Sequence, residues 1–480
     1  MKCIHEYLED CLSERGGDPY IFTKNGGVFL PRTFGETVRD VRGLAKSLSH
    51  LGFSGKRVYI FGENSYQWMV CDLAAMGYSA VSVPLDKEWT AFDLENILKQ
   101  TEKAAFFYSD SRKELIAPLM EKYKNISFFS LSDDFDRLLN SSETLPDTQL
   151  IPRRDMEKTV KIIFTSGTTS TPKAIPLSQR NMFTNWDTLY RRTPMTDSDR
   201  SYVFLPLSHV YSGIANFLYT IISGMKLYLC SDMRKINEDI IAIRPTVICT
   251  VPILLEKMYS LMTDELLEAL RSVRFLYTGG SFTRPELKSW FTDNGVCCVE
   301  AYGTSESSSV IALSKVVDGK AEKEMTVFEN LTVKILDPDS SGEGEIAVRG
   351  GSVSCGYLDF PGNSFCFDEN GFYHTGDLGR LDSENHLYVS GRKKRTLITP
   401  DGENVYADEI EKLITENPDI HAAKVFIENG EITATVYAEF CSAGESGIRA
   451  FMESVNEKLP KFKKIRRLHI KDDKPGGRMK

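Results

Sequence analysis

The chain has 480 residues, 41% of them hydrophobic and 26% charged, which is enough for one large and one small domain, each with its own core. Its formal net charge of -9 argues against general nucleic-acid binding, because nucleic-acid-binding domains are usually basic. No apolar run reaches membrane-spanning length, and acidic residues stand where a signal peptide would be apolar, so we expect a soluble, cytoplasmic protein without a transmembrane segment.

The N-terminal part of the chain alternates between helical and strand-like segments. Apolar residues recur at helical spacing between residues 34 and 51, and the strand-like run VYIFG follows at 58–62. A second helical stretch, 68–76, leads into the strand-like VSVPLD at 81–86. This alternation continues to about residue 330. It predicts parallel sheets flanked by helices, with ligands beyond the carboxyl ends of the strands.

The segment KIIFTSGTTSTPKAIP, at 161–176, contains the first candidate site. Its strand-like start stops at hydroxyl residues grouped about Gly167 and followed by Lys173. The glycine allows a close backbone approach, the hydroxyls donate hydrogen bonds and the lysine adds a positive charge, which suits a polyphosphate. Taken alone, a Ser/Thr-rich surface turn is an equally good interpretation. Pro172 and Pro176 argue against a P-loop, in which the lysine opens a helix, and favour a strand, loop, strand arrangement.

Two later loops contain side chains that suit a nucleotide. The first, AYGTSE, spans 301–306. An aromatic ring such as that of Tyr302 can stack on a base, a hydroxyl such as that of Ser305 can bond a phosphate, and the carboxylate of Glu306 suits Mg²⁺. In the second, HTGDLGR, Asp377 can accept hydrogen bonds from both ribose hydroxyls. For the first loop alone a polar surface loop is the simpler interpretation, and a TGD tripeptide alone is common.

The pattern changes near residue 330. From there to about 390 the sequence has short β segments separated by turns, which predicts a β-rich subdomain. The last ninety or so residues predict a helix near 407–416, a hairpin that turns at Asn429-Gly430, and a final helix with one apolar face. We therefore predict an α/β protein: a large N-terminal domain, 1–391, of helix-flanked sheets with a β-rich subdomain at about 330–390, and a small α+β C-terminal domain, 392–480.

Together with GRKKRTLITPDGENVYADEIE, at 391–411, these motifs resemble those of the AMP-forming adenylating superfamily, which includes acyl-CoA synthetases, peptide-synthetase adenylation domains and luciferases. The resemblance covers nearly the whole chain, in family order and with family-like spacing, and is closest to fatty acyl-CoA synthetases. The chain departs from the family pattern at Ser170 and Ala174, where glycine is usual. The resemblance implies that the ATP- and AMP-binding residues are Thr165, Ser166, Gly167, Thr168, Thr169, Ser170, Lys173, Gly280, Tyr302, Gly303, Thr304, Ser305, Asp377 and Arg392.

The resemblance also implies roles in catalysis, domain motion and acid binding. The small domain is mobile and turns about Lys394, and Gly402 lines the tunnel through which a thiol arrives. Glu306 is the ligand of Mg²⁺. The catalytic residues are Lys173, Glu306, His209 and Arg478, and the acyl pocket involves His209, Gly279, Gly280 and Ser281. For His209, a hydrogen-bonded core histidine is the alternative interpretation.

The C-terminus departs most clearly from the family pattern. The lysine that usually reaches the α-phosphate corresponds to Arg478, and Lys474 or Lys480 are the alternatives. An arginine keeps the charge but presents it in a bulkier, planar group. We therefore expect adenylation to be slower than in relatives that have the lysine. A nucleotide- or acyl-adenylate-binding protein with weak ligase activity is an alternative function.

In the family that the chain resembles, peptide-synthetase domains usually carry an aspartate shortly after the Leu-Pro stretch, where it pairs with an amino group. This chain has LPLSHVY at 205–211 and no aspartate nearby, so the resemblance favours an uncharged acyl or aryl acid. The expected function is the ATP-dependent activation of a fatty or related acid as acyl-AMP with release of pyrophosphate. Thioester formation with coenzyme A follows. The second alternative is the loading of an acyl or aryl acid onto the phosphopantetheine of an acyl carrier protein.

Overall fold

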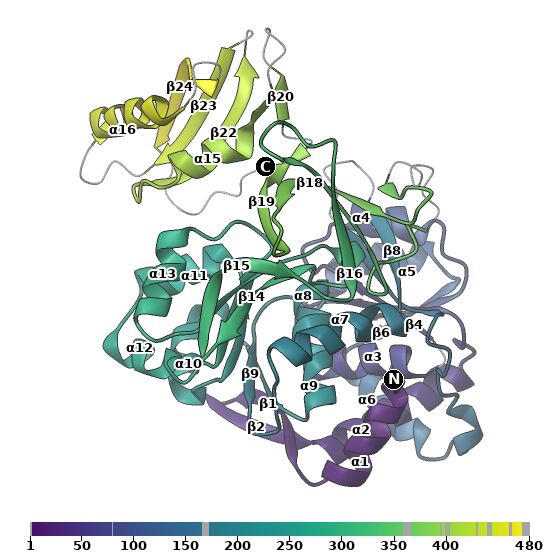
Figure 1. The fold of residues 1–480 in the computed structure, drawn as a ribbon. Coiled ribbons are helices and arrows are strands. Elements are labelled where there is room, and N and C mark those ends of the chain that lie inside the picture. The colour runs from purple at the N-terminus through teal and green to yellow at the C-terminus, as the bar shows by residue number, and fades with distance from the viewer. Residues whose placement is uncertain are drawn as a thin grey trace. The chain divides into compact units, whose positions relative to one another are not determined.

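The structure, a computed structural model, describes residues 2–78, 80–165, 172–358, 366–393, 396–398, 404–428, 431–438, 444–459 and 463–472. The chain forms a large unit, Met1–Thr332 with Val348–Tyr373, and a small unit, Val333–Ala347 with His374–Lys480. The predicted α/β class is confirmed (Figure 1). The domain boundary at residue 391 stays a prediction. None of the helices in the described ranges is long and apolar enough to cross a membrane.

The first sheet of the large unit has the strand order β6-β5-β3-β4-β7-β8. Neighbouring strands are parallel, except that β8 runs antiparallel to β7. Strands buried on both faces read as continuous apolar runs, which explains why VYIF in β3 is fully buried. The strands are β3 (Arg57–Phe61), β4 (Val81–Leu85), β5 (Ala104–Tyr108), β6 (Ile126–Ser130), β7 (Thr159–Thr165) and β8 (Lys173–Ser178).

The first α-helices of the chain alternate in sequence with the strands of the N-terminal part. The helix α2 begins after Thr33 because the Thr33 hydroxyl accepts a hydrogen bond from the Glu36 N–H, while the Glu36 carboxylate accepts one from the Thr33 N–H. The apolar face predicted for α2 is confirmed, since Val38, Val41, Leu44, Ala45 and Leu48 are buried. The helices are α1 (Ile4–Arg15), α2 (Phe34–His50), α3 (Tyr66–Gly77), α4 (Ala91–Leu98), α5 (Lys113–Lys122) and α6 (Asp133–Ser142).

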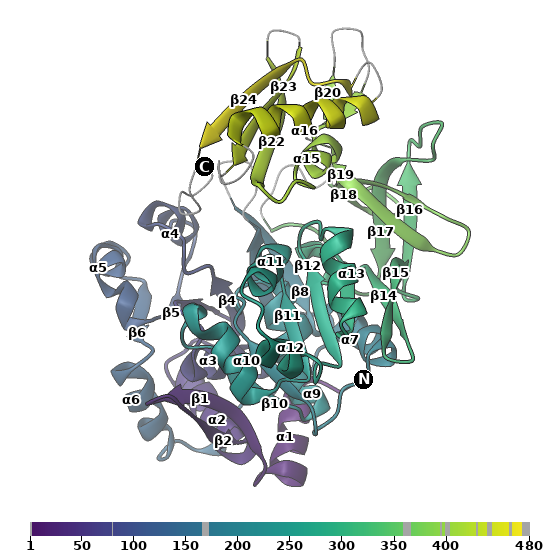
Figure 2. The ribbon, with the colours of Figure 1, turned by 90° about the vertical axis from the view of Figure 1, so that its left-hand side faces the viewer.

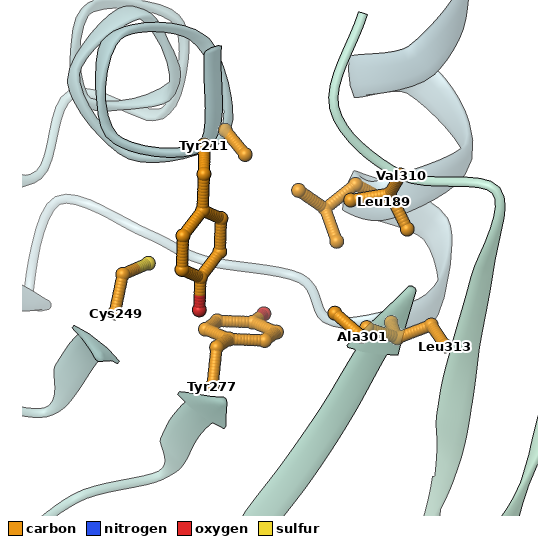
Figure 3. A pocket seen from close by; sticks show the side chains of 8 residues that line it. Leu189, Tyr211, Cys249, Tyr277, Ala301, Val310 and Leu313 are labelled. Atoms are coloured by element: carbon orange, nitrogen blue, oxygen red, sulfur yellow. The ribbon is translucent and has the colours of Figure 1, made fainter. Parts of the chain in front are cut away.

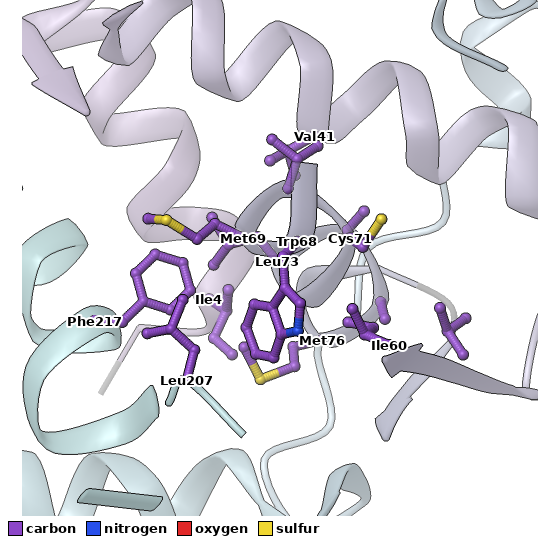
Figure 4. Close-up of a cluster of buried hydrophobic side chains, with 14 of the residues drawn as sticks. Ile4, Val41, Ile60, Trp68, Met69, Cys71, Leu73, Met76, Leu207 and Phe217 are labelled. Carbon is purple, nitrogen blue, oxygen red and sulfur yellow. The ribbon is translucent and has the colours of Figure 1, made fainter. Parts of the chain in front are cut away.

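The core of the large unit is organised around α3, which is buried along its whole length. Figure 4 shows Trp68 of α3 between Val41 of α2 and Leu207, which lies far along the chain. Ile60 of β3 and Phe217 belong to the same cluster. A helix that is buried on nearly every side is stable only where each face is covered, and here a sheet, a helix and a later segment cover it.

The second sheet of the large unit contains strands from both ends of that unit. Its order is β15-β14-β13-β12-β11-β9-β10-β1-β2. The strands from β13 to β1 are parallel, and β14, β15 and β2 are antiparallel to their neighbours. The strands are β1 (Pro19–Asn25), β2 (Val28–Thr33), β9 (Arg200–Val203), β10 (Lys226–Leu229), β11 (Val247–Thr250), β12 (Phe275–Gly279), β13 (Cys298–Tyr302), β14 (Ala312–Val317) and β15 (Lys320–Val327).

Helices cover both faces of the second sheet. The helices α10 to α13 lie on one side of β11 and β12 and stand in front of them in Figure 2. The helices α7 and α9 lie on the opposite side of the sheet in Figure 1. The helices are α7 (Gln179–Arg192), α8 (Val210–Ser212), the π-helix η3 (Gly213–Leu218), α9 (Tyr219–Ser223), α10 (Ile236–Ile243), α11 (Pro252–Ser260), α12 (Asp264–Leu270) and α13 (Pro285–Asp293).

The small unit contains strands in the order β16-β17-β18-β19 and a sheet with the order β22-β23-β24. The predicted hairpin is confirmed, because β22 and β23 pair antiparallel up to Glu428 and Glu431, although its Asn429-Gly430 turn lies outside the described residues. The apolar face of the last helix is buried as predicted. The elements are β16 (Leu331–Leu336), β17 (Gly344–Gly350), β18 (Tyr373–Leu381), β19 (His386–Arg392), β20 (Thr396–Ile398), β21 (Asn404–Tyr406), α15 (Ala407–Ile414), β22 (Ile420–Glu428), β23 (Glu431–Ala438), α16 (Gly444–Lys458) and β24 (Arg467–Asp472).

Candidate active site

The predicted phosphate loop joins two strands of a β-hairpin. The strands β7 and β8 pair up to Thr165 and Lys173, so these two residues flank the loop. The strand, loop, strand prediction is therefore confirmed, and a P-loop, which needs a helix at the lysine, is excluded. Ser178 caps α7, because its hydroxyl accepts a hydrogen bond from the Asn181 N–H. The predicted ligands Ser166, Gly167, Thr168, Thr169 and Ser170, and the side chain of Thr165, lie outside the described residues.

Tyr357 brings Lys173 and Glu306 to one place. The Nζ of Lys173 lies over the Tyr357 ring, 4.6 Å from its centroid. The Tyr357 hydroxyl donates a hydrogen bond to Oε1 of Glu306 across 2.6 Å. Tyr357 and Glu306 are each only 6% exposed. Sequence analysis missed Tyr357, which stands in the run CGYL outside every motif, so nothing in the local sequence pointed to it.

Burial keeps the Tyr357 hydroxyl protonated. Desolvation, and secondly the neighbouring Glu306 carboxylate, raise the pKa of Tyr357. Burial also raises the pKa of Tyr373 well above its usual value, and Glu306 adds to that effect. A phenol that keeps its proton can donate a hydrogen bond to a carboxylate, so the Glu306 side chain is held in one orientation.

The turn that carries Glu306 follows directly from the end of β13 at Tyr302. Ser305 opens the short turn η5 (Ser305–Ser307), and the Thr304 hydroxyl caps it by accepting a hydrogen bond from the Ser307 N–H. The predicted adenine, phosphate and metal ligands are thus placed one after another at the carboxyl end of a central strand, where ligands of such sheets bind.

The backbone after this turn returns very close to Gly303. A Cβ on Gly303 would lie 1.6 Å from the carbonyl oxygen of Ser309, so only glycine fits. Ser308 and Ser309 have φ values of 60° and 116°, which are unfavourable for residues with a side chain. Such backbone strain clusters at functional sites, and it favours a binding role for this loop over an ordinary polar surface loop.

The predicted acyl-pocket loop lies beside the nucleotide motif. Gly279 is the last residue of β12 and pairs with Ala301 of β13, next to Tyr302. A Cβ on Gly279 would lie 2.7 Å from the Ala301 carbonyl oxygen. Gly280 has a φ of +82°, which favours glycine, and both Gly280 and Ser281 are exposed. The ends of β12 and β13 therefore form one continuous edge.

His209 lies at the surface, with 52% of its side chain exposed. Its Nε2 lies 3.4 Å from Oδ2 of Asp86, the residue that follows β4. The hydrogen bond from His209 lowers the pKa of Asp86. The alternative of a core histidine is therefore wrong, and a role of His209 in the acyl or thiol channel stays a prediction. Sequence analysis quoted Asp86 only as part of a strand, because its partner is distant in sequence.

In the small unit, the two predicted nucleotide ligands are neighbours. Asp377 and Arg392 are register partners on β18 and β19. The Nε of Arg392 lies 2.8 Å from Oδ1 of Asp377, whose side chain is 6% exposed while that of Arg392 is 58% exposed. A ribose that binds Asp377 has to share this carboxylate with Arg392. The predicted hinge Lys394, the tunnel residue Gly402, and Lys474, Arg478 and Lys480 lie outside the described residues.

Glu306 fits the coordination pattern of Mg²⁺. This cation prefers oxygen ligands and usually takes one or two carboxylates together with phosphate oxygens and waters. Glu306 supplies one oriented carboxylate close to the hairpin that carries the phosphate loop. Within the described ranges, no group of three or more His, Cys, Asp or Glu side chains could hold a metal ion on its own. The residues thus fit a Mg²⁺ ion that binds together with the phosphates of ATP.

Comparison with known proteins gives consistent results. The sequence matches the AMP-binding enzyme family over residues 26–358. The 2-succinylbenzoate–CoA ligase of Geobacillus kaustophilus is 31% identical over 348 residues, which cover 68% of this chain and 69% of that protein. The long-chain-fatty-acid–CoA ligase FadD15 of Mycobacterium bovis is 26% identical over 475 residues, which cover 86% of this chain and 78% of that protein.

The fold has a close counterpart among crystal structures. The ATP-bound MatB from Rhodopseudomonas palustris matches with a TM-score of 0.85 and 24% identity, over 99% of this chain and 96% of that one. The predicted fold is thereby confirmed across both units, and the family match extends over the strands and loops that carry Lys173, Tyr302 and Glu306. The chain therefore belongs to the AMP-binding enzyme family, the AMP-forming ligase type that its motifs indicate.

Proposed function

We propose that this chain activates a carboxylic acid, either a fatty or a related acyl acid, as acyl-AMP and transfers the acyl group to coenzyme A. The observation that best supports this function is the meeting of Lys173 and Glu306 at Tyr357. A lysine and an oriented carboxylate at the base of a hydroxyl-rich loop suit the phosphates of ATP and the Mg²⁺ that accompanies them.

In the first half-reaction, the carboxylate of the acid attacks the α-phosphorus of ATP in line, and pyrophosphate leaves. The protein has to hold two anions together and neutralise the charge on the phosphate oxygens. Lys173 supplies a positive charge, Tyr357 orients Glu306, and Glu306 would hold Mg²⁺. When bound, Mg²⁺ neutralises further charge on the phosphates. In the second half-reaction, a thiol loses its proton and attacks the acyl carbon, and AMP leaves.

The proposed acid and acceptor are supported by the residue types in the chain and by the names of similar proteins. The proteins similar to this chain include ligases for long-chain fatty acids, for 2-succinylbenzoate and, in Arabidopsis thaliana, for oxalate. Their acids differ widely, but coenzyme A is named for all of them, which supports coenzyme A as the acceptor here. The absence of an aspartate within LPLSHVY supports an acid without an amino group, because the Asp86 carboxylate that lies near this segment already contacts His209.

The function can be tested by product analysis. The purified protein is incubated with ATP, Mg²⁺, coenzyme A and a panel of acids, and nucleotides and thioesters are separated by chromatography. We expect AMP, pyrophosphate and an acyl-CoA, and no turnover when GTP replaces ATP. Release of ADP and orthophosphate would exclude adenylation. A parallel reaction with a carrier protein that bears phosphopantetheine tests the acceptor: loading of that protein alone would contradict the coenzyme A assignment.

A further inference from the structure

A pocket lies against one face of the second sheet. Cys249 and Tyr277, register partners on β11 and β12, line it together with Ala301 of β13. Leu189 of α7 and Tyr211 of α8 close it from the opposite side (Figure 3). The lining is apolar except for the two phenol hydroxyls and the thiol.

The pocket is continuous in sequence with the nucleotide motif. Ala301 directly precedes Tyr302, and Val310, which also lines the pocket, directly follows the strained turn at Ser308 and Ser309. The pocket therefore lies beside the segment proposed to bind ATP. An acid whose carboxylate reacts at the α-phosphate has to place its remaining atoms next to that segment, which is where this pocket lies.

Two aromatic rings leave little room in the pocket. Its cavity volume is about 10 Å³, about the space that one water molecule needs. In Figure 3 the Tyr211 side chain extends from α8, and its hydroxyl points toward the Tyr277 ring, which projects from β12. Gly279 stands two residues beyond Tyr277, on the same side of the strand, and presents no side chain. Gly279 therefore places no side chain over the sheet face next to the nucleotide motif. Two residues earlier on β12, the Tyr277 ring fills the space over the same face.

The Tyr211 hydroxyl is poorly satisfied. Its oxygen is buried and has no hydrogen-bond partner that meets normal geometry in the described part of the chain. The Cys249 thiol beside it is a weak partner. Burial raises the pKa of Cys249 to about 12 and that of Tyr211 well above its usual value, so both groups stay neutral. A buried hydroxyl without a partner is unfavourable, and a polar group of a ligand would satisfy it.

We propose that the acid activated by this chain is compact, that a polar group away from its carboxylate accepts a hydrogen bond from Tyr211, and that the Tyr277 ring sets the upper limit of its length. Long unbranched fatty acids are then poor substrates. This inference rests on the proposed function, and it narrows the acid from fatty or related acids to the short, polar members of that range.

The length limit is tested with Tyr277→Ala, assayed by acid-dependent pyrophosphate release over straight-chain acids of increasing length. Loss of the ring should deepen the pocket, so the preferred length should increase, and kcat/KM should gain about fourfold for each additional methylene that is buried. Tyr277→Phe keeps the ring and should keep the parent's limit. Tyr277→Leu is the milder variant to use if Tyr277→Ala does not fold. Tyr59→Ala, which opens a cavity in the first sheet, controls for general loosening.

The polar contact is tested with Tyr211→Phe. For the parent, acids with a hydroxyl or oxo group away from the carboxylate should be activated with higher kcat/KM than unsubstituted acids of the same length. In Tyr211→Phe this preference should fall about tenfold, because the donor is lost while the ring remains. Tyr59→Phe is the matched control, since Tyr59 lies in the first sheet, its buried hydroxyl bonds Thr101, and its loss should leave the preference unchanged.

The results separate this inference from the function on which it rests. If the parent forms AMP fastest with long unbranched acids, or if folded Tyr277→Ala and Tyr277→Leu keep the parent's length preference, the inference is wrong and the ligase function stands. An unchanged preference for substituted acids in Tyr211→Phe would exclude the polar contact. If no acid of any length supports AMP formation by the parent, the proposed function and the inference both fail.

Discussion

Tyr357 is expected to set how tightly Mg²⁺ is held, because its hydroxyl fixes the orientation of Glu306. The variant Tyr357→Phe keeps the ring beneath Lys173 and removes the hydroxyl that donates to Glu306. A hydrogen bond to a charged group contributes about 1.5–3 kcal/mol, so we expect the Mg²⁺ concentration for half-maximal pyrophosphate release to rise about tenfold. Tyr59→Phe is the control. An unchanged Mg²⁺ dependence would show that Tyr357 does not orient Glu306.

Asp377 is expected to bind the ribose although it already contacts Arg392. In Asp377→Ala the ribose loses its acceptor, and we expect the dissociation constant of ATP, measured by calorimetry, to rise at least about tenfold. Asp382→Ala is the matched control, because Asp382 lies in the same hairpin and bonds His386 instead. Equal ATP affinity of Asp377→Ala and the parent would contradict the ribose contact.

At the scale of single residues, the sequence predicts a ligand where a side chain of suitable chemistry also stands in a recognisable local motif. Glu306 and Asp377 are predicted because each stands in a short polar motif of the sequence, and their roles as ligands stay predictions. Tyr357 and Asp86 were missed because their importance comes from partners, Glu306 and His209, that are distant in sequence. No periodicity or composition encodes such a contact, so the structure is needed to find it.

The strand β7 is tied to the helix α3 by a buried ion pair, which we expect to stabilise the base of the phosphate hairpin. The Nζ of Lys161 lies 2.6 Å from Oδ1 and 2.7 Å from Oδ2 of Asp72, and neither side chain is exposed. The Ser82 hydroxyl donates to the same carboxylate. Burial lowers the pKa of Lys161, and Asp72 opposes this effect by stabilising the charged form.

Lys161→Met leaves the Asp72 carboxylate buried without its cation, and we expect the free energy of unfolding in urea to fall by about 3–5 kcal/mol. The double variant Lys161→Met/Asp72→Leu removes both charges and should recover most of that loss. If the single variant lost less than about 1 kcal/mol, the pair would not contribute as expected.

Glu63 joins the loops after β3 and β5 through hydrogen bonds from Ser109 and Ser111, and this contact predicts how the stability of the protein depends on pH. Burial raises the pKa of Glu63, but hydrogen bonds from the Ser109 and Ser111 hydroxyls outweigh it and lower the pKa from 4.5 to about 2. Because the folded-state pKa is the lower one, the stabilisation is present above the unfolded-state pKa and is lost as the pH falls toward 2.

Glu63→Gln should therefore destabilise the protein at neutral pH and progressively less as the pH falls below 4.5. The side chain is 43% exposed, so after solvent screening we expect a loss of only about 1 kcal/mol in urea unfolding. Glu102→Gln, at a side chain that is 92% exposed, should have no effect at any pH. A loss that is equal at neutral and acidic pH would contradict the role of the charge.

At the scale of elements, helices with one apolar face were predicted well, because their stability depends on local periodicity. The faces of α2 and α16 are buried at the expected positions. The π-helix η3 was not predicted, since its six residues, GIANFL, carry no signal that distinguishes it from an α-helix. Its place beside Tyr211, whose side chain closes the pocket, agrees with the tendency of π-helices to occur near functional sites.

At the scale of the whole molecule, the alternation of strands and helices predicted the α/β class but not how the strands are shared between sheets. The strands β1 and β2 precede β3 in sequence, yet they pair at the far end of the second sheet, next to β10. Strand order depends on contacts between distant segments, which a single sequence does not reveal. The change of pattern near residue 330 predicted a β-rich subdomain of the large domain, whereas the small unit of the structure already includes Val333–Ala347 together with His374–Lys480.

The residue at position 478 is expected to affect the two half-reactions differently. The usual lysine would place a compact ammonium at the α-phosphate, whereas an arginine spreads its charge over a bulkier planar group. We therefore expect Arg478→Lys to accelerate acid-dependent pyrophosphate release by roughly tenfold, which corresponds to about 1.4 kcal/mol of transition-state stabilisation. Transfer from preformed acyl-adenylate to coenzyme A should change much less, because the resemblance implies that the opposite face of the small domain serves the thioester step.

The alternative is that Lys474 or Lys480 already occupies the lysine position through a shift of this glycine-containing end. Both half-reactions are therefore assayed in Arg478→Lys, Arg478→Ala, Lys474→Ala and Lys480→Ala. If Arg478→Lys releases pyrophosphate no faster than the parent, while one of the alanine variants abolishes release, then the parent already uses that lysine. If neither alanine variant impairs release and Arg478→Ala does, the arginine itself neutralises the phosphate, and the slower adenylation follows from its geometry rather than from a missing charge.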